Sequence, residues 1–332
     1  MTSLPPRRGV HFRVLRDSLA QQLIDEIPNL ARRGVNVIVV EIDYSFEFAR
    51  PENRPYCYKE EGKDAVSQHR AEALVRQARE NGIRLIPEFN CLGHQGINTS
   101  IYPLLALNPD FDETPGYPNI PTRAWCPRHP GVMPVVLGLI DEIIDVFQAD
   151  AIHVGMEEVL EISSPLCPRG CMHYHPAELF AGVVMDLHTH IVWRRGLEML
   201  MWGDRLLDIR YQPGANVHDA SANWTHRAIS LIPTKQVVIC DWHYNLPPGN
   251  PRDRYPSIQR FLDHGFKVWP TCGTQPSSAK PFSDYSRCMR EQNPDVLGFL
   301  CTTWNVIAFP GAADTSPIKE IIPDWKEPES RE

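Results

Sequence analysis

Polar and aromatic side chains follow short, β-branched segments at several points along the chain. Two adjacent glutamates, Glu157 and Glu158, follow residues 151–155, and His94 follows residues 83–90. Other such segments end at carboxylates, an amide and aromatic rings: Asp43, Trp202, Asp204, Trp242, Tyr244, Trp304 and Asn305. Carboxylates can exchange protons and bind hydroxyls, while indole rings stack on the apolar faces of sugars. These residue types predict a carbohydrate site with acid–base chemistry, provided that the fold brings them together.

The elements that must position these residues repeat one pattern, a β-branched segment followed by an amphipathic helix, which is typical of a parallel sheet. Predicted strands lie at residues 9–14, 35–43, 83–90, 151–155, 198–202, 236–241, 266–270 and 296–302. Predicted helices lie at residues 18–33, 64–80, 131–147, 176–195 and 316–322. Ser18 is the predicted N-cap of the first helix and Gly34 ends it. Residues 205–235 show neither the helical nor the strand periodicity. Eight strands predict an α/β fold, a (β/α)8 TIM barrel that forms a single catalytic domain over residues 1–332. Such barrels carry their chemistry where the strands end.

The alternation within residues 35–43 indicates which side chains face the mouth of the barrel. One face of this strand carries Val37, Val39, Glu41 and Asp43, and the other face carries Ile38, Val40 and Ile42. Both faces of a barrel strand are buried, and buried charges need polar surroundings. The face with Glu41 and Asp43 is therefore the one expected to reach the mouth of the barrel.

Charge and composition exclude several classes of function. The net charge is −8 and the basic residues are scattered, which argues against a nucleic-acid partner. No apolar run approaches the roughly 18 residues that span a bilayer, and the first residues lack the apolar segment of a signal peptide. Three of the nine cysteines, Cys240, Cys272 and Cys301, lie in predicted core strands, which is typical of reduced thiols. We therefore expect a cytoplasmic protein with no membrane partner.

A metal site is the alternative interpretation of one cysteine-containing segment. Cys167 and Cys171 are followed by two histidines, and two earlier residues could complete a ligand set: His173, His175, Cys126 and His129. The spacing is loose and no Cys-x-x-Cys pair occurs, so the sequence predicts no metal and no other cofactor.

Residues 152–159, Ile-His-Val-Gly-Met-Glu-Glu-Val, resemble the His-x-Gly-x-Asp-Glu signature of glycoside hydrolase family 20, the β-N-acetylhexosaminidases. Four further segments resemble the family's motifs in the same order, and the match is closest to short members with a single barrel. These segments are Arg8-Gly9, residues 86–94 with Pro87-Glu88 and Gly93-His94, Trp202-Gly203-Asp204, and Trp304.

The resemblance implies a retaining, exo-acting enzyme in which the 2-acetamido oxygen of the substrate attacks the anomeric carbon, so that no enzyme nucleophile is needed. Glu157 would hold the acetamide N–H, and Glu158 would protonate the leaving oxygen. The implied substrate is a glycan or glycoconjugate with a terminal N-acetylglucosamine or N-acetylgalactosamine, bound by residues that match the motifs or follow the strands: Arg8, His153, Trp202, Asp204, Trp242, Tyr244, Trp304 and Asn305.

Two positions depart from the family's pattern. The first acid is normally Asp but is Glu157 here, and Val306 stands where the family often has Glu. The change at Val306 bears on the choice between gluco and galacto substrates and on the tightness of binding. The change at Glu157 bears on the catalytic rate, so a sugar-binding barrel that is catalytically impaired at Glu157 is the alternative to an active enzyme.

The residues also predict an acid relay. His94 would hydrogen-bond Glu158, and Asp43 would orient His94. A neighbouring carboxylate and a tryptophan-lined pocket would raise the pKa of Glu158, as a general acid working near neutrality requires.

Overall fold

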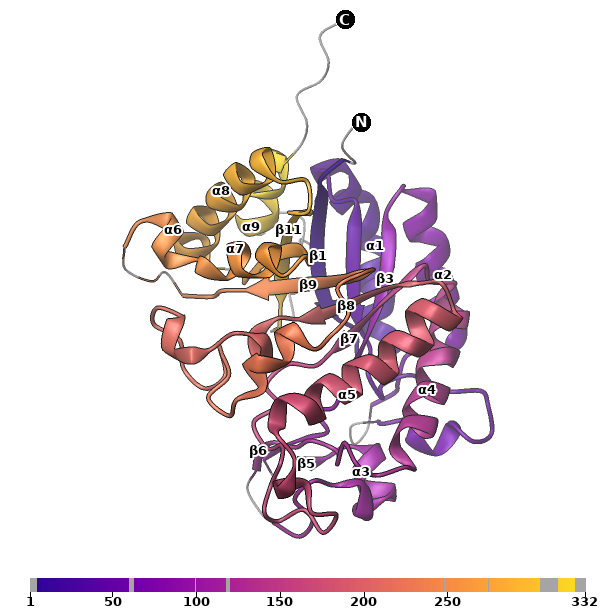
Figure 1. Cartoon of the computed structure of the whole chain (residues 1–332). Helices are drawn as coiled ribbons and strands as arrows, with labels where there is room; N and C mark the ends of the chain where they lie inside the picture. The colour runs from indigo at the N-terminus through magenta and orange to yellow at the C-terminus, as the bar shows by residue number, and fades with distance from the viewer. Residues whose placement is uncertain are drawn as a thin grey trace, which may run out of the picture.

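Eight parallel strands close into a barrel surrounded by helices (Figure 1). The structure is a computed structural model that describes residues 5–59, 63–98, 100–117, 120–245, 247, 249–273, 275–304 and 316–325. The strands follow one another around the barrel in chain order, and the last, β11, pairs with the first, β1. The predicted (β/α)8 TIM barrel is therefore confirmed, while a single domain over residues 1–332 stays a prediction.

Each predicted strand is present, with its ends shifted by at most two residues. The barrel strands are β1 (Arg7–Arg13), β2 (Val37–Glu41), β3 (Arg84–Cys91), β7 (Ala151–Gly155), β8 (Glu198–Trp202), β9 (Val237–Trp242), β10 (Lys267–Cys272) and β11 (Gly298–Thr303). The helices are α1 (Asp17–Arg33), α2 (Gln68–Glu80), α3 (Pro103–Leu107), α4 (Val132–Phe147), α5 (Pro176–His188), α6 (Pro251–Arg254), α7 (Pro256–Asp263), α8 (Pro276–Gln292) and α9 (Ser316–Glu320).

The start of α1 differs from the sequence prediction, whereas its end is as expected. Gly34 takes the left-handed conformation at φ 101° and its N–H caps the last turn, as predicted. Ser18 is not the N-cap, because the helix already begins at Asp17. The Asp17 carboxylate instead accepts hydrogen bonds from the N–H and Oγ of Ser67, the N-cap of α2, and so joins two helices.

The segment 205–235 departs from the repeating unit. It contains no α-helix but has three 3-10 helices, η5 (Asp204–Leu206), η6 (Ile209–Tyr211) and η7 (Thr225–Ser230). The long segment after β3 also forms structure of its own, a small sheet of β4 (Gly96–Asn98), β5 (Ser100–Ile101) and β6 (Ile120–Thr122) that lies below the barrel in Figure 1. No described helix has the length and apolar character needed to cross a bilayer.

The two faces of β2 divide as the alternation predicted. Val37 and Val39 belong to the cluster inside the barrel, whereas Ile38, Val40 and Ile42 pack outward against the helices. Trp269 fills the same interior, and it leaves no room for a side chain at Gly9. A Cβ at Gly9 would lie 2.2 Å from the Trp269 ring and 2.8 Å from Leu300.

We expect Gly9→Ala to destabilise the protein by about 1–3 kcal/mol, because a rigid ring in a close-packed core cannot move aside cheaply. Urea unfolding of the purified protein measures the effect. Gly182→Ala is the matched control, since Gly182 lies on the exposed side of α5 with nothing within 4 Å, and it should stabilise by up to about 1 kcal/mol. Equal midpoints for the two variants would contradict the packing argument.

Candidate functional site

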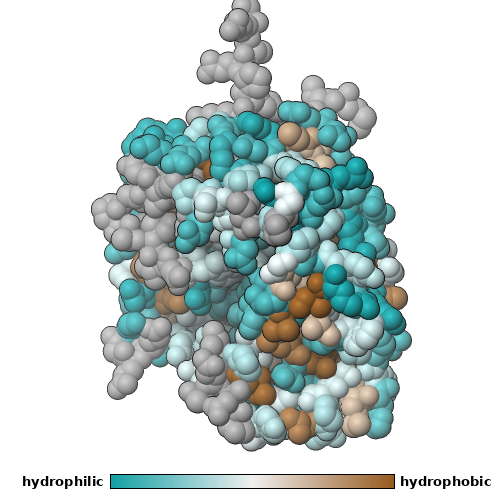
Figure 2. All heavy atoms as spheres, turned by 90° about the vertical axis from the view of Figure 1, so that its left-hand side faces the viewer, coloured by the Kyte–Doolittle hydropathy of each residue, from teal (hydrophilic) through white to brown (hydrophobic). Residues whose placement is uncertain are grey.

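The carboxyl ends of the parallel strands bring most of the predicted residues to one end of the barrel. Glu157 and Glu158 follow β7, His94 lies just beyond β3, Tyr244 follows β9, and Trp304 follows β11. Figure 2 views the molecule from the side toward which β9 points, and its surface is hollowed near the centre, beside a hydrophobic patch. This end of the barrel is the candidate site.

Three of the four predicted catalytic residues have an unusual backbone. Asp43, His94 and Glu158 take left-handed φ angles of 45°, 55° and 48°. Each such non-glycine conformation costs on the order of 1–3 kcal/mol and persists only where the surroundings impose it. The strain therefore clusters at the candidate site.

The side chain of Glu158 lies between two histidines. Its Oε2 is 3.2 Å from His94 Nε2 and 3.3 Å from His218 Nδ1. Burial raises the pKa of Glu158, but the interactions with His94 and His218 outweigh it and hold the pKa below its ordinary value. His94 lies beside Glu158 as predicted, at ion-pair distance but without the geometry of the predicted hydrogen bond. The predicted raised pKa of Glu158 is wrong for the free protein.

The backbone of Glu158 is held as firmly as its side chain. Its N–H donates to Asp204 Oδ2 at 2.9 Å, and its carbonyl accepts from Thr122 Oγ1 at 2.8 Å. Asp204 Oδ2 also accepts from Arg205 Nε, and Arg205 Nη2 donates to the carbonyl oxygens of Val217 and His218. Asp204 therefore connects the backbone of Glu158 to the segment that carries His218. It is buried and its Oδ1 has no hydrogen-bond partner among the described residues, and its predicted contact with substrate stays a prediction.

Glu157 behaves oppositely to its neighbour. Burial raises its pKa well above the ordinary value, and the charges of Glu88, Asp204 and Glu158 raise it further. The doublet thus contains one carboxyl that favours its proton and one that favours ionisation. Two adjacent acids with separated pKa values are the arrangement that general acid–base chemistry uses.

Asp43 does not orient His94, which corrects the predicted relay. Its Oδ1 accepts from the N–H of Asn90 at 2.7 Å and its Oδ2 from Asn90 Nδ2 at 3.3 Å. Burial and the charge of Glu41 raise the pKa of Asp43 to about 7. Asn90 in turn packs against Gly155, where any Cβ would lie 2.0 Å from Asn90 Oδ1. Asp43 therefore fixes the contact between β3 and β7 beneath the glutamates.

A group of charged residues that the sequence analysis missed lies below the site. His11 Nε2 is 3.2 Å from Glu88 Oε2 and 3.4 Å from Glu41 Oε2, inside the barrel. Burial lowers the pKa of His11, but the two carboxylates outweigh it and raise the pKa to about 9. The available signal was the inward-facing position of His11 on β1, opposite Val39 and next to Glu41 on β2.

Two residues predicted to bind substrate, Trp202 and His153, have no exposed surface in the free protein. Trp202 is completely buried, donates from Nε1 to Glu88 Oε1 and packs 4.4 Å from the ring of His153. His153 is also completely buried, and its Nδ1 accepts the N–H of Gly155. Both residues support the floor of the site.

The remaining aromatic residues lie nearer the opening. Trp242 stacks on Tyr244 with ring centroids 4.9 Å apart, and Tyr244 Oη accepts from Trp304 Nε1 and from Thr302 Oγ1. A pocket opens beside this stack, lined by Gln212, Pro213, Gly214, Ala215, Asp219, Trp242, His243, Tyr244, Asn245, Pro247 and Arg254. Trp242 and Tyr244 are therefore placed to contact a ligand in this pocket, and Trp304 holds the hydroxyl of Tyr244.

Arg8 lies at the wrong end of the barrel for the role predicted for it. It stands at the start of β1, where its Nε donates to the carbonyl of Gly34, whereas the site lies where the strands end. Arg13 is the arginine of this strand nearest the site, and it donates to Glu41 Oε1 at 3.0 Å. Asn305, the remaining predicted residue, and Val306 lie outside the described residues.

Comparison with known proteins identifies related sequences and folds. A sequence profile of glycosyl hydrolase family 20, catalytic domain, matches residues 20–244. A search of curated protein sequences found no match.

Three of the similar solved structures are hexosaminidases that cover 98% of this chain. A β-N-acetylhexosaminidase from Bacteroides fragilis has a TM-score of 0.65 at 15% identity. A β-N-acetylglucosaminidase from Vibrio harveyi, solved with N-acetylglucosamine, has 0.64 at 14%, and a β-N-acetylhexosaminidase from Streptomyces coelicolor has 0.61 at 11%. This chain spans only 67%, 55% and 66% of their respective lengths. At such identities the likeness establishes the fold.

We expect His94→Asn to raise the pKa of Glu158, because His94 contributes the largest interaction that lowers it. Carbon-13 NMR titration of side-chain-labelled glutamate measures this pKa, with Glu158→Gln identifying the signal. His129→Asn is the control, since His129 pairs with Asp110 and not with Glu158. An unchanged pKa in His94→Asn would show that the contact carries no charge interaction.

Proposed function

Because this chain belongs to glycosyl hydrolase family 20, we propose that it is an exo-acting, retaining β-N-acetylhexosaminidase. Its substrate is a glycan or glycoconjugate with a terminal N-acetylglucosamine or N-acetylgalactosamine. One observation carries the proposal. Glu157 and Glu158 lie side by side at the end of β7, and their pKa values are shifted in opposite directions.

The division of roles follows from these surroundings. The acetamide N–H of the sugar donates to the carboxyl of Glu157, which leaves the acetamide oxygen free to attack the anomeric carbon. Glu158 protonates the leaving oxygen and later removes a proton from the attacking water. No enzyme nucleophile is required, which is the family's exception to the scheme of two carboxylates with a covalent intermediate.

The proton for Glu158 requires a source, since its pKa is lowered in the free protein. A bound sugar displaces water, and the lower dielectric favours the uncharged carboxyl. His94 Nε2, at 3.2 Å, is within reach to transfer a proton to Glu158 Oε2 as the substrate binds. His218 contacts the same oxygen and can do the same from the other loop.

The acetamido group decides the rate in this mechanism. We expect an aryl N-acetyl-β-glucosaminide to be hydrolysed orders of magnitude faster than the matching aryl β-glucoside, because the glucoside lacks the attacking oxygen. A cyclic thiazoline that mimics the intermediate should inhibit. Initial rates with both substrates test the proposal, and equal rates would overturn the mechanism.

Two variants show that the measured activity belongs to this site. Glu158→Gln keeps the shape but has no transferable proton, so kcat should fall about 10²–10⁴-fold. Glu161→Gln, the same change three residues later, should leave kcat near that of the wild type.

Glu157 is the one position that favours the alternative, a catalytically impaired sugar-binding barrel, because it is one methylene longer than the family's Asp. An active site built around the longer side chain should lose activity in Glu157→Asp and lose more in Glu157→Ala. We expect this order, because about 1 Å of misplacement can cost a hundredfold. The measurement is kcat/KM on one aryl N-acetylhexosaminide. An Asp variant faster than the wild type would favour the impaired barrel.

A further inference from the structure

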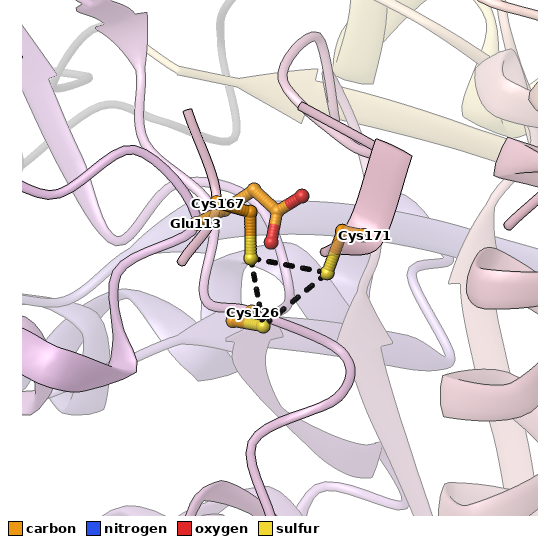
Figure 3. A group of neighbouring side chains, drawn as sticks. All are labelled: Glu113, Cys126, Cys167 and Cys171. Carbon is orange, nitrogen blue, oxygen red and sulfur yellow. Dashed lines mark hydrogen bonds between the residues drawn. The ribbon is translucent and has the colours of Figure 1, made fainter. Parts of the chain in front are cut away.

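Three cysteines and one glutamate meet in a buried cluster outside the carbohydrate site (Figure 3). The Sγ atoms of Cys126, Cys167 and Cys171 are 3.4, 3.5 and 3.1 Å apart in their three pairs. One carboxylate oxygen of Glu113 completes the group, and the four potential ligand atoms lie within 4.8 Å of one another. All four residues are buried. We name these four residues the Cys3Glu cluster.

Two separate segments of the chain are built to bring these residues together. Glu113 and Cys126 lie on the segment after β3, in paired stretches where the N–H of Glu113 donates to Ala124 and the N–H of Cys126 donates to Phe111. Cys167 and Cys171 lie on the loop after β7, four residues apart. A tight turn between them needs the left-handed φ of 65° at Gly170, whose N–H donates to the carbonyl of Cys167.

The glutamate is hard to explain as ordinary packing. Its exposed fraction is zero, and its Oε1 accepts the N–H of Ser164. Its Oε2 has no hydrogen-bond partner among the described residues. A buried carboxylate with an unpaired oxygen is costly unless a cation or a further donor meets it. Three sulfurs at the same place supply no positive charge.

We propose that the Cys3Glu cluster binds one zinc ion. Thiolates are preferred ligands of Zn²⁺, and a carboxylate oxygen is an accepted fourth. Zinc–sulfur bonds of about 2.3 Å in a tetrahedron place the sulfurs about 3.8 Å apart, so the three sulfur pairs, at 3.4, 3.5 and 3.1 Å, need to open by about 0.3–0.7 Å. All four ligands come from the protein, which is the arrangement of a structural site with no open position.

A disulfide fits these observations less well. It would require two sulfurs to close to about 2.05 Å, and it would leave one thiol and the buried Glu113 without a partner. The histidines that the sequence suggested as ligands are not in the cluster. His129 contacts Asp110 instead, and the fourth ligand is Glu113, which no Cys or His pattern would have indicated.

The zinc would fix the loops that carry the catalytic groups without touching the substrate. The segment after β3 carries His94 near its start and reaches Cys126, and the loop after β7 carries Glu158 near its start and reaches Cys171. Two hydrogen bonds already join the two loops, from Thr122 Oγ1 to the carbonyl of Glu158 beside the site and from the N–H of Ser164 to Glu113 at the cluster. The inference does not rest on the proposed activity, since metal content is measured without a substrate.

The test begins with the full-length protein purified in reductant and analysed by atomic emission for metal. We expect about one zinc per chain, and cobalt substituted for it should give the visible and thiolate charge-transfer bands of tetrahedral Co²⁺. Cys167→Ser/Cys171→Ser should lose the metal, and Glu113→Gln should hold it more weakly. Cys288→Ser is the matched control, because Cys288 is exposed on α8, and it should keep the full zinc content.

A second measurement remains decisive if the cysteine variants fail to fold. Titrating the wild-type protein with a mercurial reagent, in the presence of a zinc indicator, should release one zinc as three buried thiols react. Metal-depleted wild type should unfold at a Tm lower by about 5 °C or more and recover on adding zinc.

Several outcomes would overturn the proposal. These are wild-type protein with little zinc and no tetrahedral cobalt spectrum, zinc that persists in Cys167→Ser/Cys171→Ser, and non-reducing peptide mapping that finds a disulfide among the three cysteines.

Discussion

The candidate site rests on a buried group of charges in the barrel interior, where His11 lies between Glu41 and Glu88. Removing one member of a buried, paired group costs about 3–5 kcal/mol, because the remaining charge is left without compensation. His11 has a pKa near 9 in the fold and 6.5 ordinarily. Its charge therefore stabilises the fold fully below pH 6.5, and this stabilisation is lost as the pH rises through 9.

The same interior charges separate the two glutamates above them. Glu157 faces the carboxylates of Glu88 and Asp204 from a buried position, which keeps its proton in place. Glu158 points toward His94 and His218 and is partly open to solvent, which favours its charge. The two side chains are adjacent in sequence, yet the barrel gives them different electrostatic surroundings. The left-handed backbone of Glu158 accompanies the different directions of the Glu157 and Glu158 side chains.

Periodicity predicted the barrel, because β-branched strands and amphipathic helices repeat with different periods, and it placed His94 beside Glu158. Periodicity did not predict segments without a regular apolar pattern, and it did not predict how deep a side chain lies in the barrel. Proline-rich, polar α8 and the non-periodic segment containing His218 gave no helical or strand signal. The predicted strand at residues 9–14 already placed Arg8 at its start, away from the strand ends that carry the chemistry, so the two-residue match alone suggested a substrate role for Arg8. The depth of Trp202 depends on how side chains fill the interior, which no motif encodes.

The segment of 3-10 helices between β8 and β9 contacts both the backbone and the side chain of Glu158. It begins with Asp204, which holds the amide of Glu158, and it carries His218, which contacts the carboxylate of Glu158. Arg205 ties these two parts of the segment together. Selection that reshapes this segment for a different leaving group would therefore also change the proton affinity of Glu158. Descendants with new specificities should differ in their pH optima, even if every residue of the barrel core is unchanged.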